Sequence, residues 1–219
     1  MTEKLVNRDP PAPRRAEPAP LRAISPVELA EQLEAHRRWL ESGRGDGRRL
    51  DLGRCNLTGA ALQGLLLSRA KLNRAVLNRA RLSAAKLDRA NLIGVQLEEA
   101  LLDRADLTGA RLSGANLRRV DLTEARAADL DAEFADFSGA RLDHADLSVA
   151  DLSGAIMAGA SLTGTRLCGT NLRGADLRQA RLGGADLRDA KLAVADLRAR
   201  ILPARTCGAY ICAWRNLTT

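Results

Sequence analysis

A leucine recurs at every fifth position from Leu52 to Leu202, and this period constrains the fold more than any other feature of the chain. Only four positions of the series depart from leucine, namely Ala127, Ala132, Phe137 and Met157. A second series of small residues, mostly alanine, lies two positions before the first. Internal repetition at a fixed short period indicates a solenoid rather than an ordinary globular domain.

Neither standard element suits a five-residue period. On an α-helix, successive leucines would be rotated by about 140° and would wind around the whole surface. On a straight strand, an odd period sends them to opposite faces. A chain that corners after every five residues directs all of them to one axis, and four corners close a coil. We therefore predict an all-β solenoid whose coils stack like parallel strands, about 4.8 Å apart.

Glycine and proline support this geometry. Twelve corner positions, two after the central residue, are glycine, as expected where a corner needs a positive φ. No proline lies between Pro26 and Pro203, so the backbone N–H groups can bond to the neighbouring coil. The predicted core includes Leu72, Leu92, Leu112, Leu152 and Phe137.

Several units have the form Ala-Asp-Leu followed by two variable residues, for example residues 105–109, 150–154 and 185–189. They resemble the A(D/N)LXX motif of the pentapeptide repeat family. The resemblance implies a right-handed quadrilateral parallel β-helix over residues 50–202, without enzymatic activity. It also implies a partner class, because some members bind DNA gyrase, imitate duplex DNA and protect this type II topoisomerase from inhibitors.

Residues 25–42 carry the boundary signals of a helix. Ser25 fits the N-cap, Pro26 the first helical position, and Glu28 completes a capping box. Gly43 fits the stop. A stripe that would cover the open first coil comprises Leu29, Leu33, His36 and Leu40. We predict an N-terminal capping α-helix and turn over residues 25–49, and we interpret His36 and Trp39 as packing residues.

The two ends of the chain differ from the repeat. Residues 1–24 are rich in proline among charges, which predicts a disordered arm. Pro203 stops the repeat, and an aromatic segment follows over residues 203–219. We expect this segment to cap the last coil, to form a homodimer contact, or both, through Tyr210, Ile211 and Trp214.

Composition restricts the classes of protein to which this chain can belong. Aromatic residues make up 2% of the chain, too few for an ordinary core, whereas stacked leucine and alanine do not need them. No apolar run approaches the roughly 18 residues of a membrane span, and no signal-peptide core is visible, so we expect a cytoplasmic protein. Cys55 fits a core slot, Cys168 an outward slot, and the cysteine spacing is not that of a zinc site. We expect no enzyme, no metal and no cofactor.

Residues 20 apart should stack, which turns the sequence into a surface map. On one wall the charge then alternates at every coil, through Lys86, Asp106, Arg126, Asp146, Arg166 and Asp186. Such cross-strand pairs contribute about 0.2–1 kcal/mol each, and less when exposed. We interpret the series as a ladder that fixes the register of the coils, with a binding stripe as the alternative.

Charge also varies along the rod. Residues 69–89 and 166–200 are basic, and we call them the N-terminal and C-terminal basic collars. Between them lies an acidic waist, our candidate partner-binding site, formed by Asp121, Glu124, Asp129, Asp131, Glu133, Asp136, Asp143, Asp146 and Asp151. The collars lack aromatic residues and spread over all walls, which argues against sequence-specific nucleic-acid binding. The net charge of +7 favours weak contact with polyanions.

Residues 126–134 interrupt the pattern. Alanine occupies the central positions 127 and 132, while Leu130, Phe134 and Phe137 compete for the axis. We predict a local bulge or a small corner loop here.

Three functions remain open. The resemblance favours a non-catalytic binding protein that contacts DNA gyrase by partial DNA mimicry. The second is a structural or assembly scaffold that binds another protein. The third is weak contact with a polyanion or a membrane surface through the basic collars.

Overall fold

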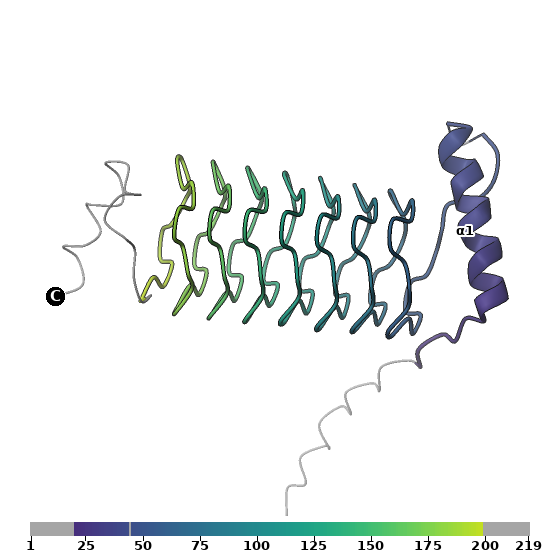
Figure 1. Cartoon of the computed structure of the whole chain (residues 1–219), viewed down its shortest axis with the longest axis horizontal. Helices are drawn as coiled ribbons and strands as arrows, with labels where there is room; N and C mark the ends of the chain where they lie inside the picture. The colour runs from purple at the N-terminus through teal and green to yellow at the C-terminus, as the bar shows by residue number, and fades with distance from the viewer. Residues whose placement is uncertain (1–19, 44, 199–219) are drawn as a thin grey trace, which may run out of the picture.

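The computed structural model describes residues 20–43 and 45–198 (Figure 1). Within these ranges the chain forms one helix, α1 (Pro26–Glu41), followed by a stack of coils that runs to the end of the described part. The coils contain isolated parallel β-bridges, one residue long, rather than extended strands. The predicted solenoid is therefore confirmed, with its strand content reduced to single bridged residues.

Each bridge within the coils joins two residues that are 20 apart, from Asp51↔Lys71 to Asp176↔Asp196. The bridged positions recur every five residues, so one circuit has four bridged walls. We name the walls by their first bridged residue: wall A starts at Asp51, wall B at Asn56, wall C at Ala61 and wall D at Leu66. Leu72 and Leu92 follow the bridged pair Lys71↔Asn91 and lie on one wall, as the surface map requires.

Backbone hydrogen bonds follow the same repeat. The Leu72 N–H donates to the Asn91 carbonyl of the next coil at 2.8 Å, and the Asn91 N–H donates back to the Ala70 carbonyl at 2.9 Å. The Ala75 N–H closes the corner by donating to the Leu72 carbonyl at 3.0 Å. Because each wall repeats this set, nearly every interior N–H of the rod has a partner, which explains why proline is excluded.

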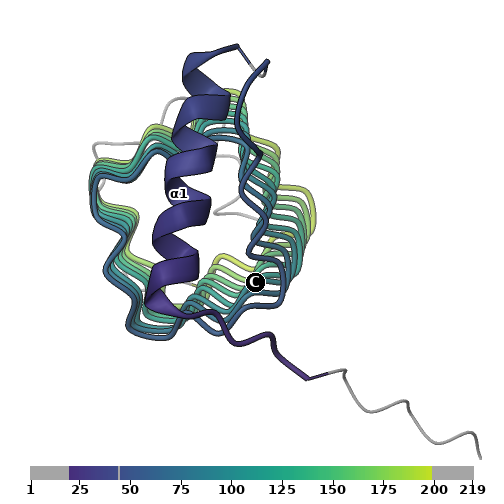
Figure 2. The same ribbon diagram turned by 90° about the vertical axis from the view of Figure 1, so that its right-hand side faces the viewer.

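The coils stack in register around one axis (Figure 2). A column of buried leucines and alanines fills this axis. The predicted core residues Leu72, Leu92, Leu112, Leu152 and Phe137 are all at most 1% exposed. Alanine in the small slot lets leucine fill the narrow axis, so the packing is dense without aromatic rings. Where threonine replaces alanine, at Thr165 and Thr170, its hydroxyl donates to a carbonyl of the preceding coil at 2.7 Å.

Every corner of the rod is left-handed. From residue 54 to residue 194, φ is positive at each fifth position, in 12 glycines and in 17 residues of other types. The predicted need for positive φ is confirmed, but glycine supplies fewer than half of the corners. The other side chains accept a conformation that costs roughly 1–2 kcal/mol each. The stacked neighbours evidently hold the corners in place, because the same backbone bonds recur on both types.

The predicted bulge at residues 126–134 is wrong. The bridges, the positive-φ corners and the bonds between coils continue through this interval. Only the corner bond from the Leu130 N–H to the Ala127 carbonyl is absent there. Leu130 occupies a small slot and is 2% exposed, between the buried central alanines Ala127 and Ala132. One leucine in a small slot thus stands in for the two leucines missing from the central slots, which offsets part of the lost core volume. Phe134 does not compete for the axis at all, because it occupies a corner and is 71% exposed.

Helix α1 begins and ends as its boundary residues predict. The Ser25 side chain accepts a hydrogen bond from the Glu28 N–H at 3.1 Å, Pro26 opens the helix and Gly43 follows it with φ +65°. The Glu28 carboxylate accepts from the Gln32 side chain at 2.9 Å instead of returning to the cap, so only half of the capping box forms among the described residues. Leu29 and Leu33 pack against the first coil.

His36 anchors this helix to the coil. Its side chain is fully buried, stacks on Trp39 with ring centroids 5.6 Å apart, and accepts a hydrogen bond from the Leu50 N–H at Nδ1 (3.1 Å). Residues 20–24, part of the predicted disordered arm, also contact the coil, because Arg22 forms a parallel bridge with Cys55. The rest of the arm lies outside the described residues.

Candidate partner-binding surface

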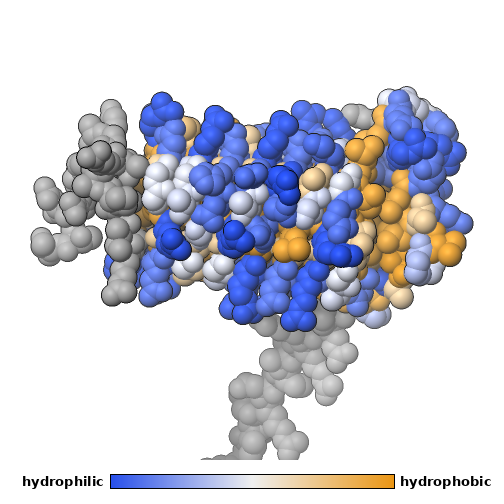
Figure 3. Space-filling model, viewed as in Figure 1, coloured by the Kyte–Doolittle hydropathy of each residue, from blue (hydrophilic) through white to orange (hydrophobic). Residues whose placement is uncertain are grey.

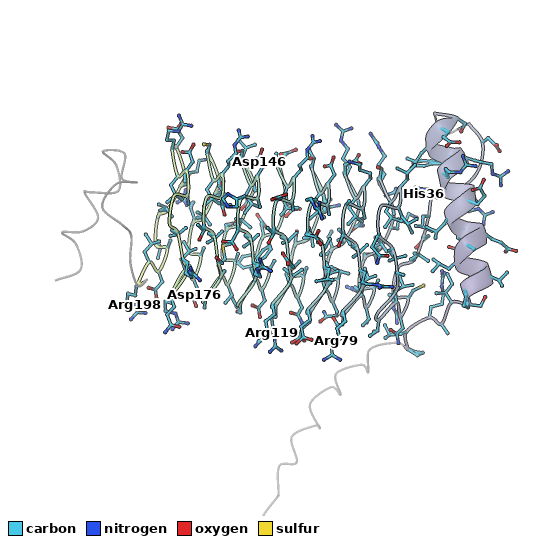
Figure 4. The ribbon with its side chains drawn as sticks, in the orientation of Figure 1. His36, Arg79, Arg119, Asp146, Asp176 and Arg198 are labelled. Atoms are coloured by element: carbon cyan, nitrogen blue, oxygen red, sulfur yellow. The ribbon has the colours of Figure 1, made fainter. Side chains whose placement is uncertain are left out.

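The alternating charges stack on wall D as predicted. Bridges join Lys86 to Asp106 and continue in steps of 20 to Asp186. Within this column Arg126 lies 3.8 Å from Asp106, and Arg166 lies 3.4 Å from Asp146. Asp146 is therefore flanked by Arg126 and Arg166, and Figure 4 shows it on the upper rim of the rod. The arginines are about two-thirds exposed, so each pair contributes little to stability.

The aspartates of the repeat have a second role that their spacing did not reveal. An Asp or Asn at the bridged position accepts a hydrogen bond from the N–H two residues later, within its own corner. The Asp146 carboxylate, for example, accepts from the Ser148 N–H at 3.0 Å. The same bond forms at Asp121, Asp136, Asp151 and Asp176. Asx turns of this kind explain the D/N position of the motif.

These contacts change the pKa values of the aspartates in the charge ladder of wall D. Partial burial alone would raise the pKa of Asp146, but hydrogen bonds from Ser148 and the charges of Arg166 and Arg126 outweigh it. The pKa of Asp146 is therefore below its ordinary value, and the pKa of Asp106 is lowered in the same way beside Thr108 and Arg126. The ladder carboxylates are charged at neutral pH.

The acidic waist is a belt around the rod rather than a strip along it. Its nine members occupy all four walls within neighbouring coils. Four of them form ion pairs with arginines, namely Asp121, Asp131, Asp136 and Asp146. Asp143 accepts from Ser161 and Thr163, and Asp151 accepts from Ser153 and Asn171. Most of the waist is thus partly neutralised by its own neighbours.

Three waist residues remain without an ion pair or hydrogen bond among the described residues: Glu124, Asp129 and Glu133. Glu124 and Asp129 are exposed on consecutive corners, and half-buried Glu133 follows on the next wall. We call these three residues the acidic corner. Because none of them has an ion pair among the described residues, they form the part of the waist best suited to an external cationic group.

The N-terminal collar also carries unpaired charge. Arg79 pairs with Glu99 at 2.9 Å and Lys71 with Asp51 at 3.3 Å. The remaining cations of this collar have no ion pair in the described part of the chain: Arg69, Arg74, Arg81, Lys86 and Arg89. Figure 4 shows Arg79 and Arg119 projecting from the lower rim, opposite to Asp146.

A shallow hollow of about 470 Å³ on wall C is lined by Arg141, Asp143, His144, Ser161, Thr163 and Arg181. No group of three His, Cys, Asp or Glu side chains within residues 20–43 and 45–198 is placed to hold a metal ion. Cys55 is buried in its core slot and Cys168 is half-buried, as expected. Tyr210, Ile211 and Trp214, the predicted cap or dimer residues, lie outside the described residues.

The family model for pentapeptide repeats matches residues 51–89, 85–123, 133–167 and 170–198, in eight copies. The chain belongs to the pentapeptide repeat family. The matched ranges cover most of the coils, and the gap between residues 123 and 133 coincides with the exchanged core slots around Leu130.

Solved pentapeptide repeat proteins resemble this member of the family. A trypsin-treated form of QnrB1, a plasmid-mediated fluoroquinolone resistance protein, is 22% identical over 66% of this chain and 79% of that chain, with a TM-score of 0.44. A thylakoid-lumen protein of Arabidopsis thaliana is 28% identical over 54% of this chain and 68% of that chain, with a TM-score of 0.38. HetL of Nostoc, involved in heterocyst differentiation regulation, is 28% identical over 84% and 100%, with a TM-score of 0.27.

None of the curated proteins matches the chain. Helix α1 is neither long enough nor apolar enough to cross a membrane, and no other helix occurs within the described ranges.

Proposed function

We propose that this pentapeptide repeat protein is a non-catalytic binding module whose acidic waist contacts a protein partner. The supporting observation is the acidic corner, where Glu124, Asp129 and Glu133 lack any cation partner within the described part of the rod. Elsewhere on the waist, arginines and turn N–H groups already occupy the carboxylates. A rigid coil that presents carboxylates without ion pairs is suited to binding a cationic surface.

The specific partner proposed is a bacterial type II topoisomerase, DNA gyrase, in the cytoplasm. The family resemblance suggests this partner, and the right-handed quadrilateral form that it implies would give a rod of duplex-like width. The carboxylates of the acidic corner would take the place of DNA phosphates in partial mimicry. The QnrB1 relative is a fluoroquinolone resistance protein, and protection from such an inhibitor is the activity to test here.

A supercoiling assay with purified DNA gyrase tests this proposal, with and without a quinolone. We expect the full chain to inhibit supercoiling or to protect it from the drug. The triple variant Glu124→Gln, Asp129→Asn, Glu133→Gln should weaken the effect about tenfold, through loss of three charges that face the partner.

The matched control removes three exposed charges from helix α1, with Glu31→Gln, Glu34→Gln and Glu41→Gln. This variant should act like the unsubstituted chain, because its net charge change is the same but its location is different. A chain that neither inhibits nor protects excludes gyrase as the partner. Equal loss in both triple variants would instead show a general charge effect and would remove the acidic corner from the proposal.

The unpaired cations of the N-terminal collar favour a second candidate, weak contact with a polyanion or an anionic membrane surface. Charge reversal at Arg74, which has no ion pair among the described residues, and at Arg79, which pairs with Glu99, should then abolish sedimentation with anionic liposomes at low salt. A scaffold that assembles with another protein through its flat walls is compatible with the same rod, and failure of both assays would favour it.

A further inference from the structure

Only part of the first coil is covered at its N-terminal end. Figure 2 shows α1 crossing the middle of the coil and leaving one side of the wall outline open. On wall A the edge is covered by the chain that leads from α1 into the coil. This chain reaches the wall at Leu50, whose N–H donates to His36 Nδ1. On wall B, Arg22 donates to the Arg54 carbonyl at 2.8 Å and accepts from the Asn56 N–H at 3.1 Å. No described segment forms a backbone–backbone hydrogen bond with Ala61 or Leu66, within residues 60–67 at the start of walls C and D. The end of wall D is covered, because Arg49 Nε donates to the Arg69 carbonyl.

The backbone of this edge is unpaired where later coils are paired. One coil further on, Arg81 and Lys86 donate to the Ala60 and Leu65 carbonyls at 2.9 Å. The carbonyls of Arg81 and Lys86 accept from the Leu62 and Leu67 N–H groups at 2.8 and 2.7 Å. Ala61 and Leu66, the corresponding residues of the first coil, have neither bond among the described residues. The edge therefore offers two N–H donors and two carbonyl acceptors in the spacing of a parallel bridge.

The side chains of the edge are apolar. Leu66 is 44% exposed, Ala61 is exposed, and Ala60 and Leu65 pack only partly against the core. Residues 60–67 contain no charged side chain, although sheet edges in soluble proteins are usually protected by charge or proline. Figure 3 shows apolar atoms gathered at the N-terminal end beside α1, on a face that is otherwise mainly hydrophilic.

Positive charge surrounds this edge. Arg81 and Lys86 stack directly behind Ala61 and Leu66, and Arg69 and Arg89 occupy the nearest corners of wall D. None of these four cations has an ion pair among the residues of the described rod. The local acid, Asp88, already accepts a hydrogen bond from Ser68. A segment that pairs with the edge would thus meet apolar side chains in front and, behind them, cations without an ion pair in the described rod, of which Lys86 also lies beside Asp106 in the ladder.

From these observations we propose that the open edge of the first coil, residues 60–67, binds an extended acidic peptide segment of a partner protein. The peptide adds a β-bridge on walls C and D, parallel to the coil, as Arg22 does on wall B. Its apolar side chains contact Leu65 and Leu66, and its carboxylates reach Arg81 and Lys86. This surface is separate from the acidic waist and needs a partner of opposite charge.

Binding to the full-length chain can be measured by fluorescence anisotropy with a labelled peptide of alternating valine and glutamate, long enough to span two walls. Two control peptides isolate the two parts of the recognition. One replaces every glutamate with lysine, and the other carries N-methyl groups on the bonds that face the edge. We expect both controls to bind at least about tenfold more weakly than the valine–glutamate peptide.

The protein offers a matched pair of variants. Leu66→Glu places a negative charge on the edge, whereas Leu101→Glu places one at a leucine that is equally exposed (42%) but lies within the paired coils of wall C. We expect Leu66→Glu to weaken binding at least about tenfold and Leu101→Glu to leave it within about twofold. Because both leucines are partly exposed at bridged positions, both variants should fold, and thermal unfolding verifies this.

Amide hydrogen exchange gives an independent result. The Ala61 and Leu66 amides should exchange quickly in the free chain and slowly with the valine–glutamate peptide, while the Arg81 and Lys86 amides stay protected throughout. Protection of Ala61 and Leu66 in the free chain would overturn the proposal, because the chain would then cover its own edge. If the N-methylated peptide bound as tightly as the valine–glutamate peptide, or if inorganic polyphosphate bound at the same site equally well, charge attraction alone would explain binding. Either result would also overturn the proposal.

Discussion

At the residue scale, the aspartates of the repeat serve the corner first and the surface second. The Asp146 carboxylate accepts from the Ser148 N–H at 3.0 Å and also lies 3.4 Å from Arg166. The first bond is local and partly buried, whereas the second involves an arginine that is 66% exposed. Water and salt screen the ion pair far more than the turn bond, so the turn bond should account for most of the stabilisation.

Substitution at Asp146 separates the two contributions. Asp146→Asn keeps an oxygen for the Ser148 N–H and should change the free energy of unfolding by less than about 0.5 kcal/mol. Asp146→Ala removes the acceptor as well and should cost about 1–2 kcal/mol. Chemical denaturation at neutral pH measures both. Equal losses in the two variants would mean that the charge ladder, and not the turn, sets the value.

Corner glycines provide a second test at this scale. Gly154 has φ +65°, and a Cβ there would lie 2.5 Å from the Phe134 ring, which covers this corner from the preceding coil. Gly159 has φ +69° and would place a Cβ in open space. Both alanine variants pay the left-handed backbone cost of about 1 kcal/mol, but Gly154→Ala must also displace the ring. We expect Gly154→Ala to be the more destabilising by about 1 kcal/mol.

A double-mutant cycle identifies the cause of that difference. In a Phe134→Ala background, Gly154→Ala should cost no more than Gly159→Ala, as judged by thermal or chemical unfolding. Persistence of the extra loss without the Phe134 ring would show that the two corners differ in their backbone.

At the scale of the element, helix α1 is held to the first coil by a histidine that must be neutral. His36 Nδ1 accepts from the Leu50 N–H, so this nitrogen cannot carry a proton in the docked helix. Burial lowers the pKa of His36, and nearby Arg49 acts in the same direction, while the Ser68 backbone opposes the shift. Nε2 makes no hydrogen bond of normal geometry within the described residues, so the Ser68 backbone offsets the effect of burial only in part.

The sign of the resulting pH dependence follows from linkage. The folded chain binds a proton at His36 less readily than the unfolded chain, whose histidine has a pKa of about 6.5. Stability is therefore full above that value and falls as the pH decreases below it, by up to about 1.4 kcal/mol per pH unit. Urea unfolding at pH values on both sides of about 6.5 measures this slope.

The variant His36→Met supplies the control for this prediction. It should be less stable at neutral pH by about 1–3 kcal/mol, because the Leu50 N–H loses its acceptor. Its stability should nevertheless be flat between about pH 7 and pH 5.5, above the range in which carboxylates titrate. An unchanged slope in this variant would assign the pH dependence to another group.

At the scale of the whole molecule, the sequence predicted the architecture because the five-residue period of the repeat determines where the chain turns. The spacing of the leucines determined which residues share a wall, and the stack through Asp106, Arg126 and Asp146 followed without further information. The predicted bulge is wrong because buried Leu130 fills part of the space that Ala127 and Ala132 leave, and this exchange depends on packing in three dimensions. The left-handed corners at arginine and valine were missed for a related reason, since neighbouring coils impose that backbone.

The candidate surfaces were less predictable than the fold. The sequence identified the acidic waist, but it could not show which carboxylates are already bonded to turns and arginines. It predicted a cap for the first coil but not its incomplete extent, because the direction in which α1 crosses the coil depends on packing around His36. The aromatic residues of the tail lie outside the described residues, and their proposed role in a homodimer remains a prediction.

Because one circuit has 20 residues, deletions of different lengths should change the rod in different ways. Removal of one whole circuit would shorten the rod and leave every later residue on its own wall. Removal of a single pentapeptide would still fill the interior, yet it would turn everything beyond the deletion by one quarter of a revolution. Surface features on the two sides of such a deletion would then face different directions, although the chain would remain folded, so orientation and stability in this protein can change independently.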